Sequence, residues 1–275
     1  MLELPPVATG LLAETLEKFL AEELRASGLA GYVVGLSGGV DSAVSAALAA
    51  AAVGRDRVLA LALPGPTSSP ASVRDAETVA ETFGLRLEKV DLGPAAERLA
   101  ETLGARGDRV RFGNLLARLR MVVLFDRART VPALVLGTSN KSEILLGYST
   151  LFGDAAASVQ PLGDVWKTHI FELAHALGVP EAVIAKAPTA DLWPGQTDAG
   201  ELGFDYPTVD PVLHWHHEGG MGREELMAAG FPAALVDGAL NAYRRNRFKW
   251  RPTVVARVSA SCMNVDRILP RNPER

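Results

Sequence analysis

The segment that most constrains this chain is a glycine-rich loop between a short β-branched strand and an alanine-rich helix. It reads Ser37-Gly38-Gly39-Val40-Asp41-Ser42. Glycine accepts a positive φ and has no Cβ, so Gly38 and Gly39 can turn their N–H groups toward a ligand. The helix predicted over 41–53 directs its positive N-terminal end at the same point. A tight capped turn would also use glycine and aspartate. The complete Ser-Gly-Gly-x-Asp-Ser sequence directly after a strand nevertheless indicates a pyrophosphate site.

The polar side chains of this loop predict how a nucleotide would bind. Ser37 and Ser42 supply hydroxyl donors, and the Asp41 carboxylate suits the Mg²⁺ that accompanies a nucleoside triphosphate. No lysine follows the glycines, as it does in the loop that grips terminal phosphates for phosphoryl transfer. The Gly-x-Gly-x-x-Gly of hydride-transferring dinucleotide folds is also absent. The loop therefore predicts ATP chemistry with pyrophosphate as the leaving group.

Composition narrows the class of protein. The chain has 275 residues, with 48% apolar and 22% charged residues, which fits one large globular domain. A net charge of −4 disfavours a nucleic-acid binder. Cys262, the single cysteine, excludes an internal disulfide and a zinc site built from several cysteines. Neither a signal peptide nor an apolar run of membrane-spanning length is present, so we expect a cytoplasmic protein without membrane contact.

Hydrophobic periodicity alternates between strand and helix over the first half of the chain. Strands are predicted at 31–36, 57–63, 85–90 and 132–137, and helices at 10–27, 41–53, 70–83, 94–104 and 112–130. This order predicts an α/β fold with a Rossmann-like parallel sheet and helices on both faces. Ligands of such sheets bind beyond the carboxyl ends of the strands, where the 37–42 loop lies.

The second half is predicted to be helical. A helix is expected at 165–178, and more follow at 206–218, 222–229 and 232–246. The segment between 187 and 205 lacks periodicity and is rich in proline and glycine, which is typical of a mobile lid. We expect one domain over 1–275: an α/β ATP-binding core at 10–186, the lid at 187–205, a helical extension at 206–255 and a tail at 256–275.

Several residues outside the loop have spacings that suggest ligand contacts. Glu143 lies on a short helix after strand 132–137, so it would share the ligand-binding edge with Asp41 and could flank one Mg²⁺ with it. Lys167 falls in the first turn of its helix, where a cation is unfavourable and an anionic partner is expected. Asn114 and Arg118 are four residues apart and share one helical face, whereas Arg120 lies on another.

The loop resembles the PP-loop of N-type ATP pyrophosphatases, which cleave ATP between the α and β phosphates. Further segments resemble the NAD⁺ synthetases in order and near spacing over about 10–255. They are Gly113-Asn114 to Met121, Gly137-Thr138, Phe152-Gly153-Asp154, Pro188-Thr189-Ala190-Asp191-Leu192 and Gln196-Thr197-Asp198. The resemblance implies ATP-dependent amidation of deamido-NAD⁺ by ammonia to NAD⁺, AMP and diphosphate, through an adenylated intermediate. It also implies a homodimer.

The resemblance assigns roles residue by residue. ATP would contact Gly35, Leu36, Ser37, Gly38, Gly39, Val40, Asp41, Ser42, Thr138, Lys167 and Thr189. Of these, Asp41, Lys167 and Thr189 would be catalytic, and Asp41 with Glu143 would hold Mg²⁺. Deamido-NAD⁺ would contact Asn114, Arg118, Asp154, Glu201 and Lys249. The family pattern changes at two places: Leu151 replaces a lysine, and Phe248-Lys249-Trp250 replaces His-Lys-Arg.

Some alternatives stay open at this level. No glutaminase domain precedes residue 1, and Ala260-Ser261-Cys262 lacks the surroundings of a nucleophile, so we expect free ammonia or ammonia from a separate glutaminase. One alternative is another amide-forming PP-loop ligase that acts on a different acceptor, such as a GMP-synthetase-like enzyme. A non-catalytic nucleotide-binding protein is another. His214 and His217 have metal-compatible spacing, but we interpret them as a surface or interface cluster.

Overall fold

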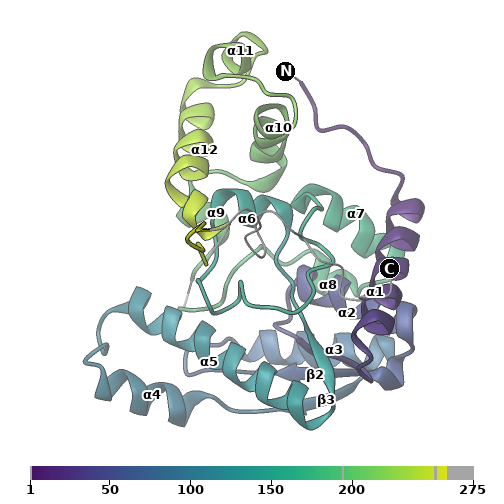
Figure 1. Ribbon diagram of the computed structural model, residues 1–275. Helices are drawn as coiled ribbons and strands as arrows, with labels where there is room; N and C mark the ends of the chain where they lie inside the picture. Colours follow the sequence, from purple (N-terminus) through teal and green to yellow (C-terminus); the bar gives the residue numbers. More distant parts are fainter. Residues whose placement is uncertain (1, 194, 251–252, 259–275) are drawn as a thin grey trace.

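The computed structural model describes residues 2–193, 195–250 and 253–258, and its centre is a four-stranded parallel sheet (Figure 1). The strands are β1 (Gly31–Gly35), β2 (Val58–Ala62), β3 (Arg86–Lys89) and β4 (Ala133–Leu136). They lie in the order β3-β2-β1-β4, and every neighbouring pair is parallel. The predicted α/β class and strand positions are confirmed, and each strand is slightly shorter than its apolar run.

Side chains alternate between the two faces of the sheet and form two cores. Tyr32 and Val34 point to one face, whereas Val33 between them points to the other. The first core is covered by α1 (Thr9–Ser27), α2 (Val40–Val53), α3 (Pro70–Phe83), α7 (Lys167–Leu177) and α8 (Glu181–Ile184). The second is covered by α4 (Gly93–Thr102) and α5 (Arg109–Thr130), and the 3-10 helix η1 (Arg55–Arg57) leads into β2.

The order of the strands creates a switch point beside β1. The chain passes from β1 to β2 and β3 on one side, and then crosses to place β4 on the other side of β1. The loops that leave the carboxyl ends of β1 and β4 therefore diverge and leave a crevice between them. The glycine-rich loop follows β1, and α6 (Lys141–Leu146) with Glu143 follows β4, as the sequence predicts.

A helical C-terminal region lies at the carboxyl side of the sheet (Figure 1). It contains α9 (Asp198–Leu202), α10 (Tyr206–His217), α11 (Arg223–Ala228), α12 (Ala233–Asn246) and the 3-10 helix η2 (Arg247–Lys249). These helices bury a third core, in which Val209 and Leu213 of α10 pack with Val236 and Leu240 of α12. The same core includes Leu146 from α6, so it is joined to the ligand edge of the sheet.

The 187–205 segment contains the short helix α9, which Thr197 caps by accepting the Gly200 N–H at 3.1 Å. A five-residue helix is too short to show a hydrophobic period. His214 stacks edge-on against Trp166 at 6.0 Å, and His217 Nδ1 lies 2.8 Å from the Tyr243 hydroxyl.

His214 is part-buried and His217 is exposed, so their interpretation as a surface or interface cluster stays a prediction. Within the described ranges, no group of three or more His, Cys, Asp or Glu residues is placed to hold a metal ion. Cys262 and the tail beyond residue 258 lie outside the described residues. No helix in the described part of the chain has the length and apolar character needed to span a bilayer.

Candidate active site

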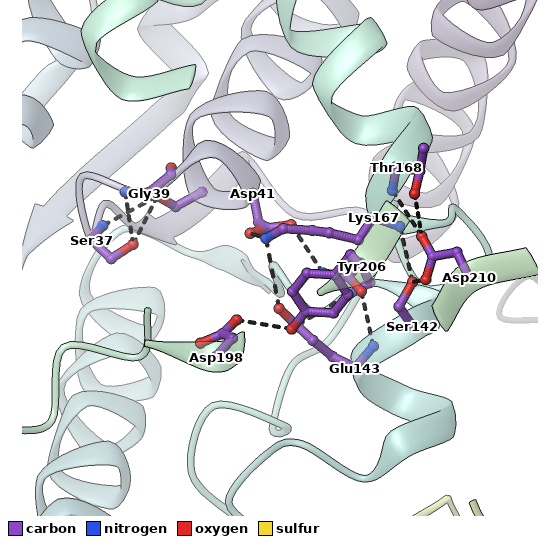
Figure 2. Close-up of polar contacts among 12 residues, drawn as sticks. Ser37, Gly39, Asp41, Ser142, Glu143, Lys167, Thr168, Asp198, Tyr206 and Asp210 are labelled. Carbon is purple, nitrogen blue, oxygen red and sulfur yellow. Dashed lines mark hydrogen bonds and ion pairs between the residues drawn. The ribbon is translucent and has the colours of Figure 1, made fainter. Parts of the chain in front are cut away.

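The glycine-rich loop is shaped by its contact with α3. Gly38 has φ +77°, and a Cβ at this position would lie 2.4 Å from the Ser72 carbonyl oxygen. Ser37 Oγ accepts the Gly39 N–H at 3.2 Å (Figure 2). Ser42 Oγ donates to the Gly39 carbonyl at 2.9 Å. The serine hydroxyls that the sequence offers as ligand donors therefore also hold the loop in its turn. Glycine at 38 is required by both backbone conformation and space.

We expect Gly38→Ala to weaken ATP binding on the order of tenfold, because about 1–3 kcal/mol of strain must be relieved by moving the loop. Calorimetric titration with ATP measures this. Gly10→Ala is the matched control, since a Cβ there meets nothing within 4 Å and its φ lies outside the positive range. Equal ATP affinity in the two variants would contradict the loop geometry.

Three charged side chains meet at the crevice between β1 and β4. Lys167 Nζ forms an ion pair with Asp41 Oδ2 and lies 3.9 Å from Glu143 Oε1. Asn140 Nδ2 donates to the other Asp41 oxygen at 3.0 Å. The three come from the first turns of α2, α6 and α7, so three helix ends converge here (Figure 2). The structure brings Asp41 and Glu143 to one edge of the sheet, as their positions after β1 and β4 predict, and it also places Lys167 beside both carboxylates.

Burial and charge decide the protonation of this group. Lys167 is only 2% exposed, and burial alone lowers its pKa. The charges of Asp41 and Glu143 outweigh that effect, so the pKa of Lys167 is raised and the ammonium is retained. Burial, followed by the charge of Asp41, raises the pKa of Glu143 well above its usual value. The single ammonium of Lys167 therefore does not balance the negative charge of the two carboxylates.

The donor set suits a hard divalent cation. Asp41 and Glu143 supply carboxylate oxygens, the ligand type that Mg²⁺ prefers. Mg²⁺ is usually bound by one or two carboxylates together with waters and substrate phosphates, so a third protein carboxylate is not needed. The raised pKa of Glu143 is consistent with such a site, because a nearby cation would favour its charged form.

A cavity of about 480 Å³ contains these groups. Nearly all of the residues assigned from the sequence line it: Gly35, Leu36, Ser37, Gly39, Val40, Asp41, Ser42, Asn114, Thr138, Glu143, Asp154, Lys167, Thr189, Glu201 and Lys249. Gly38 and Arg118 do not. Lys249 Nζ donates to the carbonyls of Gly147 and Ser149 at 2.6 and 2.7 Å, and burial lowers its pKa.

The structure shows which face of α5 meets the cavity. Asn114 and Arg120 both line it, whereas Arg118 is exposed and donates to the Leu151 carbonyl at 3.3 Å. The cavity-facing arc of the helix runs from Asn114 through Ala117 to Arg120. Asn114 lies at one edge of that arc, so the residue four positions later falls outside it. Spacing alone does not show on which side of Asn114 the arc continues.

Arg120 itself is part-buried among polar partners. Its guanidinium donates to the Leu63 carbonyl and to Ser68 Oγ, each at 3.2 Å. Burial lowers its pKa, and the charges of Asp191 and Asp154 oppose that shift. The side chain therefore fixes the loop after β2 against α5 at the wall of the cavity.

Other cavity residues were not expected from the sequence. Asp198 is 4% exposed and accepts the Tyr206 hydroxyl at 2.8 Å, and Tyr148 donates to Glu201 at 2.6 Å. Tyr148 and Glu201 are 53 positions apart, and Asp198 and Tyr206 belong to different helices, α9 and α10, so no local pattern reveals either pair. Asn140 is different, because Asn140-x-x-Glu143 has the spacing of a capping box, and the structure contains one.

Known proteins resemble this chain over most of its length. The model of the NAD synthase family matches residues 12–253. This chain belongs to the NAD synthase family. An NH3-dependent NAD⁺ synthetase of Chlorobium phaeobacteroides (strain BS1) is 41% identical over 256 residues, covering 93% of this chain and 92% of the relative. The identification drawn from the sequence is confirmed, as is its class of C–N bond-forming ligases.

Solved structures of the family share the fold. An NMN synthetase from Francisella tularensis superposes with a TM-score of 0.81 at 31% identity, covering 91% of this chain and 99% of that one. An NH3-dependent NAD synthetase from Campylobacter jejuni has a TM-score of 0.77 at 29% identity, with 92% and 100% covered. Both span almost the whole chain, so the sheet and the helical C-terminal region are common to them.

Proposed function

We propose that this protein joins ammonia to the nicotinate carboxylate of deamido-NAD⁺, using ATP and releasing AMP and diphosphate. The convergence of Asp41, Glu143 and Lys167 beside the glycine-rich loop is the observation that carries the proposal. The nicotinate carboxylate attacks the α-phosphorus of ATP and diphosphate leaves. Ammonia then attacks the adenylated carbonyl carbon, and AMP leaves with the electron pair of the broken C–O bond.

Asp41 and Glu143 would hold Mg²⁺, which supplies charge neutralisation for the phosphates when it is bound. Lys167 is held in the cavity as a cation, where it would stabilise the charge that develops on the leaving diphosphate. Thr189 Oγ1 accepts the Asp191 N–H at 3.1 Å, which leaves its hydroxyl proton to donate to a phosphate oxygen. Thr138, at the end of β4, offers a second hydroxyl to the nucleotide.

The remaining cavity residues would recognise deamido-NAD⁺. Asn114 and Asp154 are linked through Thr150, whose hydroxyl donates to Asn114 Oδ1 at 2.7 Å and whose N–H donates to Asp154 at 2.9 Å. Glu201 and Lys249 lie on the same cavity. The exposed Arg118 fits a homodimer in which the dinucleotide site is near the subunit interface. The same helix, α5, supports this interface, because its apolar residues Val122 and Phe125 are 54% and 40% exposed.

The 187–205 segment would act as the lid that shields the adenylate from water. Asp191, with φ +50°, accepts the Ser69 N–H at 3.2 Å and so ties the segment to the start of α3. Trp193 lies 5.3 Å from the Arg109 guanidinium, and the Leu192 N–H donates to Gln196 at 2.8 Å. These contacts hold the segment across one side of the cavity.

If the lid protects the adenylate, Asp191→Ala raises the AMP formed per NAD⁺, because loss of the Ser69 contact admits water. Chromatography of both products during turnover measures the ratio. Asp56→Ala, an exposed aspartate in η1, is the control and keeps the wild-type ratio. An unchanged ratio in Asp191→Ala would show that this contact does not keep water out.

The acceptor is tested by supplying candidates one at a time. Diphosphate release from ATP and ammonium is measured with deamido-NAD⁺, with the deamido mononucleotide, with xanthosine monophosphate and without acceptor. The mononucleotide arm is needed because one solved relative is named an NMN synthetase. We expect the fastest release with deamido-NAD⁺. Release with xanthosine monophosphate alone would indicate a GMP-synthetase-like enzyme, and no release in any arm would indicate a non-catalytic protein.

Ammonia would be used free or from a separate glutaminase. Ammonium and glutamine are therefore compared as nitrogen donors for the purified protein. We expect turnover with ammonium only. The proposal includes a cytoplasmic location, because ATP is abundant there.

A further inference from the structure

The start of α7 is capped by residues of other helices. Trp166, the N-cap residue, makes no side-chain hydrogen bond to its own helix. Instead, the Lys167 N–H donates to Ser142 Oγ at 3.0 Å, and the Thr168 N–H donates to Asp210 Oδ2 at 2.9 Å. Unpaired N–H groups at a buried helix start are costly, so these contacts decide where the helix begins. The helix that carries Lys167 is thus held by α6 and α10.

Asp210 is the centre of this arrangement. Its side chain is 0% exposed, and Figure 2 shows it between Ser142 and the first turn of α7. Oδ1 accepts the Ser142 hydroxyl at 2.6 Å, and Oδ2 accepts the Thr168 hydroxyl at 2.7 Å as well as the Thr168 N–H. A buried carboxylate is costly, but three hydrogen bonds and the positive end of α7 offset that cost.

The partners of Asp210 adjoin the charged residues of the cavity. Ser142 precedes Glu143 on α6, and Thr168 follows Lys167 on α7. Asp210, Ser142 and Thr168 do not themselves line the cavity. Because Ser142 bonds both Asp210 and the Lys167 N–H, the three helices are joined at one point. A shift of Asp210 would therefore change the separation of Lys167 Nζ and Glu143.

We propose that Asp210 is a positioning residue that fixes Lys167 and Glu143 relative to each other. It acts through Ser142 and Thr168 and touches no substrate. The inference rests on the proposed function, since it takes the cavity of Lys167 and Glu143 as the reacting site. It also gives α10 a role in the reaction, although α10 lies in the helical C-terminal region.

Asp210→Asn tests this with little change in shape. The amide oxygen can still accept both Thr168 bonds, but the amide nitrogen then faces Ser142, whose hydroxyl loses its acceptor. We expect kcat for deamido-NAD⁺-dependent diphosphate release to fall about 10- to 100-fold, because small misplacements of reacting groups have effects of this size. The KM for ATP should change by less than about threefold, since the phosphate-binding loop is untouched.

Asp237→Asn is the matched control in the same helical region. Asp237 of α12 also accepts two hydrogen bonds, both from the Arg223 guanidinium of α11, at 2.6 and 2.9 Å. It is part-exposed and does not line the cavity, so its loss lowers the melting temperature slightly and leaves kcat unchanged. Rates are expressed per folded protein, so that a merely structural role of Asp210 would give the same result as this control.

Ser142→Ala and the double variant complete the test. If Asp210 acts through Ser142, the double variant loses no more kcat than the worse single variant. Should Asp210→Asn fail to fold, Ser142→Ala decides: a loss of kcat with KM kept supports the proposal. Wild-type kcat in folded Asp210→Asn or Ser142→Ala overturns it, and so do fully additive losses. A wild-type protein that releases no diphosphate refutes the proposed function instead.

Discussion

Lys167→Met should lower kcat for diphosphate release by about 10²- to 10³-fold, the size of effect seen when one preorganised charge contact to a transition state is removed. Methionine keeps much of the side-chain length, but it supplies no charge to the leaving diphosphate. It also leaves Asp41 and Glu143 facing each other without the lysine that now pairs with them. Stability should fall by about 3–5 kcal/mol, the range for breaking a buried ion pair.

Two measurements separate these effects. Urea unfolding gives the stability loss, and single-turnover diphosphate release on the folded fraction gives the rate. Lys141→Met is the control: Lys141 pairs with Asp164 and Glu218 at 2.7 and 2.6 Å and does not line the cavity. Equal rates for Lys167→Met and wild type, or equal rate losses in the two methionine variants, would contradict the role of Lys167.

Asp41→Asn should abolish most adenylation without unfolding the protein. The amide keeps the shape and can still accept the Asn140 bond, but it removes a carboxylate from the proposed Mg²⁺ site. We expect affinity for the metal in the presence of ATP to fall by at least about 10- to 100-fold, the loss typical of even outer contacts of a metal site. Manganese binding followed by electron paramagnetic resonance measures this without turnover.

Glu143→Gln should lower the affinity for the metal in the same way. Lys167→Met should leave that affinity near or above the wild-type value. This contrast distinguishes a metal ligand from a charge that acts on the leaving group. Asp126→Asn, an exposed aspartate on α5, provides the control for charge removal. Near-normal metal affinity and turnover in Asp41→Asn would remove Asp41 from the metal site.

The sheet and the main cavity could be predicted because local patterns determine them. Apolar runs of strand length alternate with amphipathic helices, and parallel strands place their carboxyl ends at one edge. That rule is sufficient to bring Asp41 near Glu143, although 102 positions separate the two in numbering. Family motifs then add Lys167, Thr138 and Thr189, all of which line the cavity.

The features that the sequence could not predict depend on helix rotation and on long-range packing. The choice between Arg118 and Arg120 requires the orientation of α5 about its own axis, which the sheet and the neighbouring loops set. The contact of Asp210 with Ser142 joins residues 68 positions apart, and no local pattern connects them. Buried polar pairs of this kind consist of residue types that also occur at exposed helix positions. Only the packed structure distinguishes the buried pairs from exposed polar residues.

The central claim is that the carboxylate of deamido-NAD⁺ is adenylated in this cavity before ammonia attacks. Turnover of deamido-NAD⁺ labelled with heavy oxygen in that carboxylate tests it most directly, with mass spectrometry of the AMP formed. One labelled oxygen should appear in the phosphate of AMP, because the oxygen that attacks the α-phosphorus leaves with it. AMP without label, formed together with NAD⁺, would contradict the adenylated intermediate.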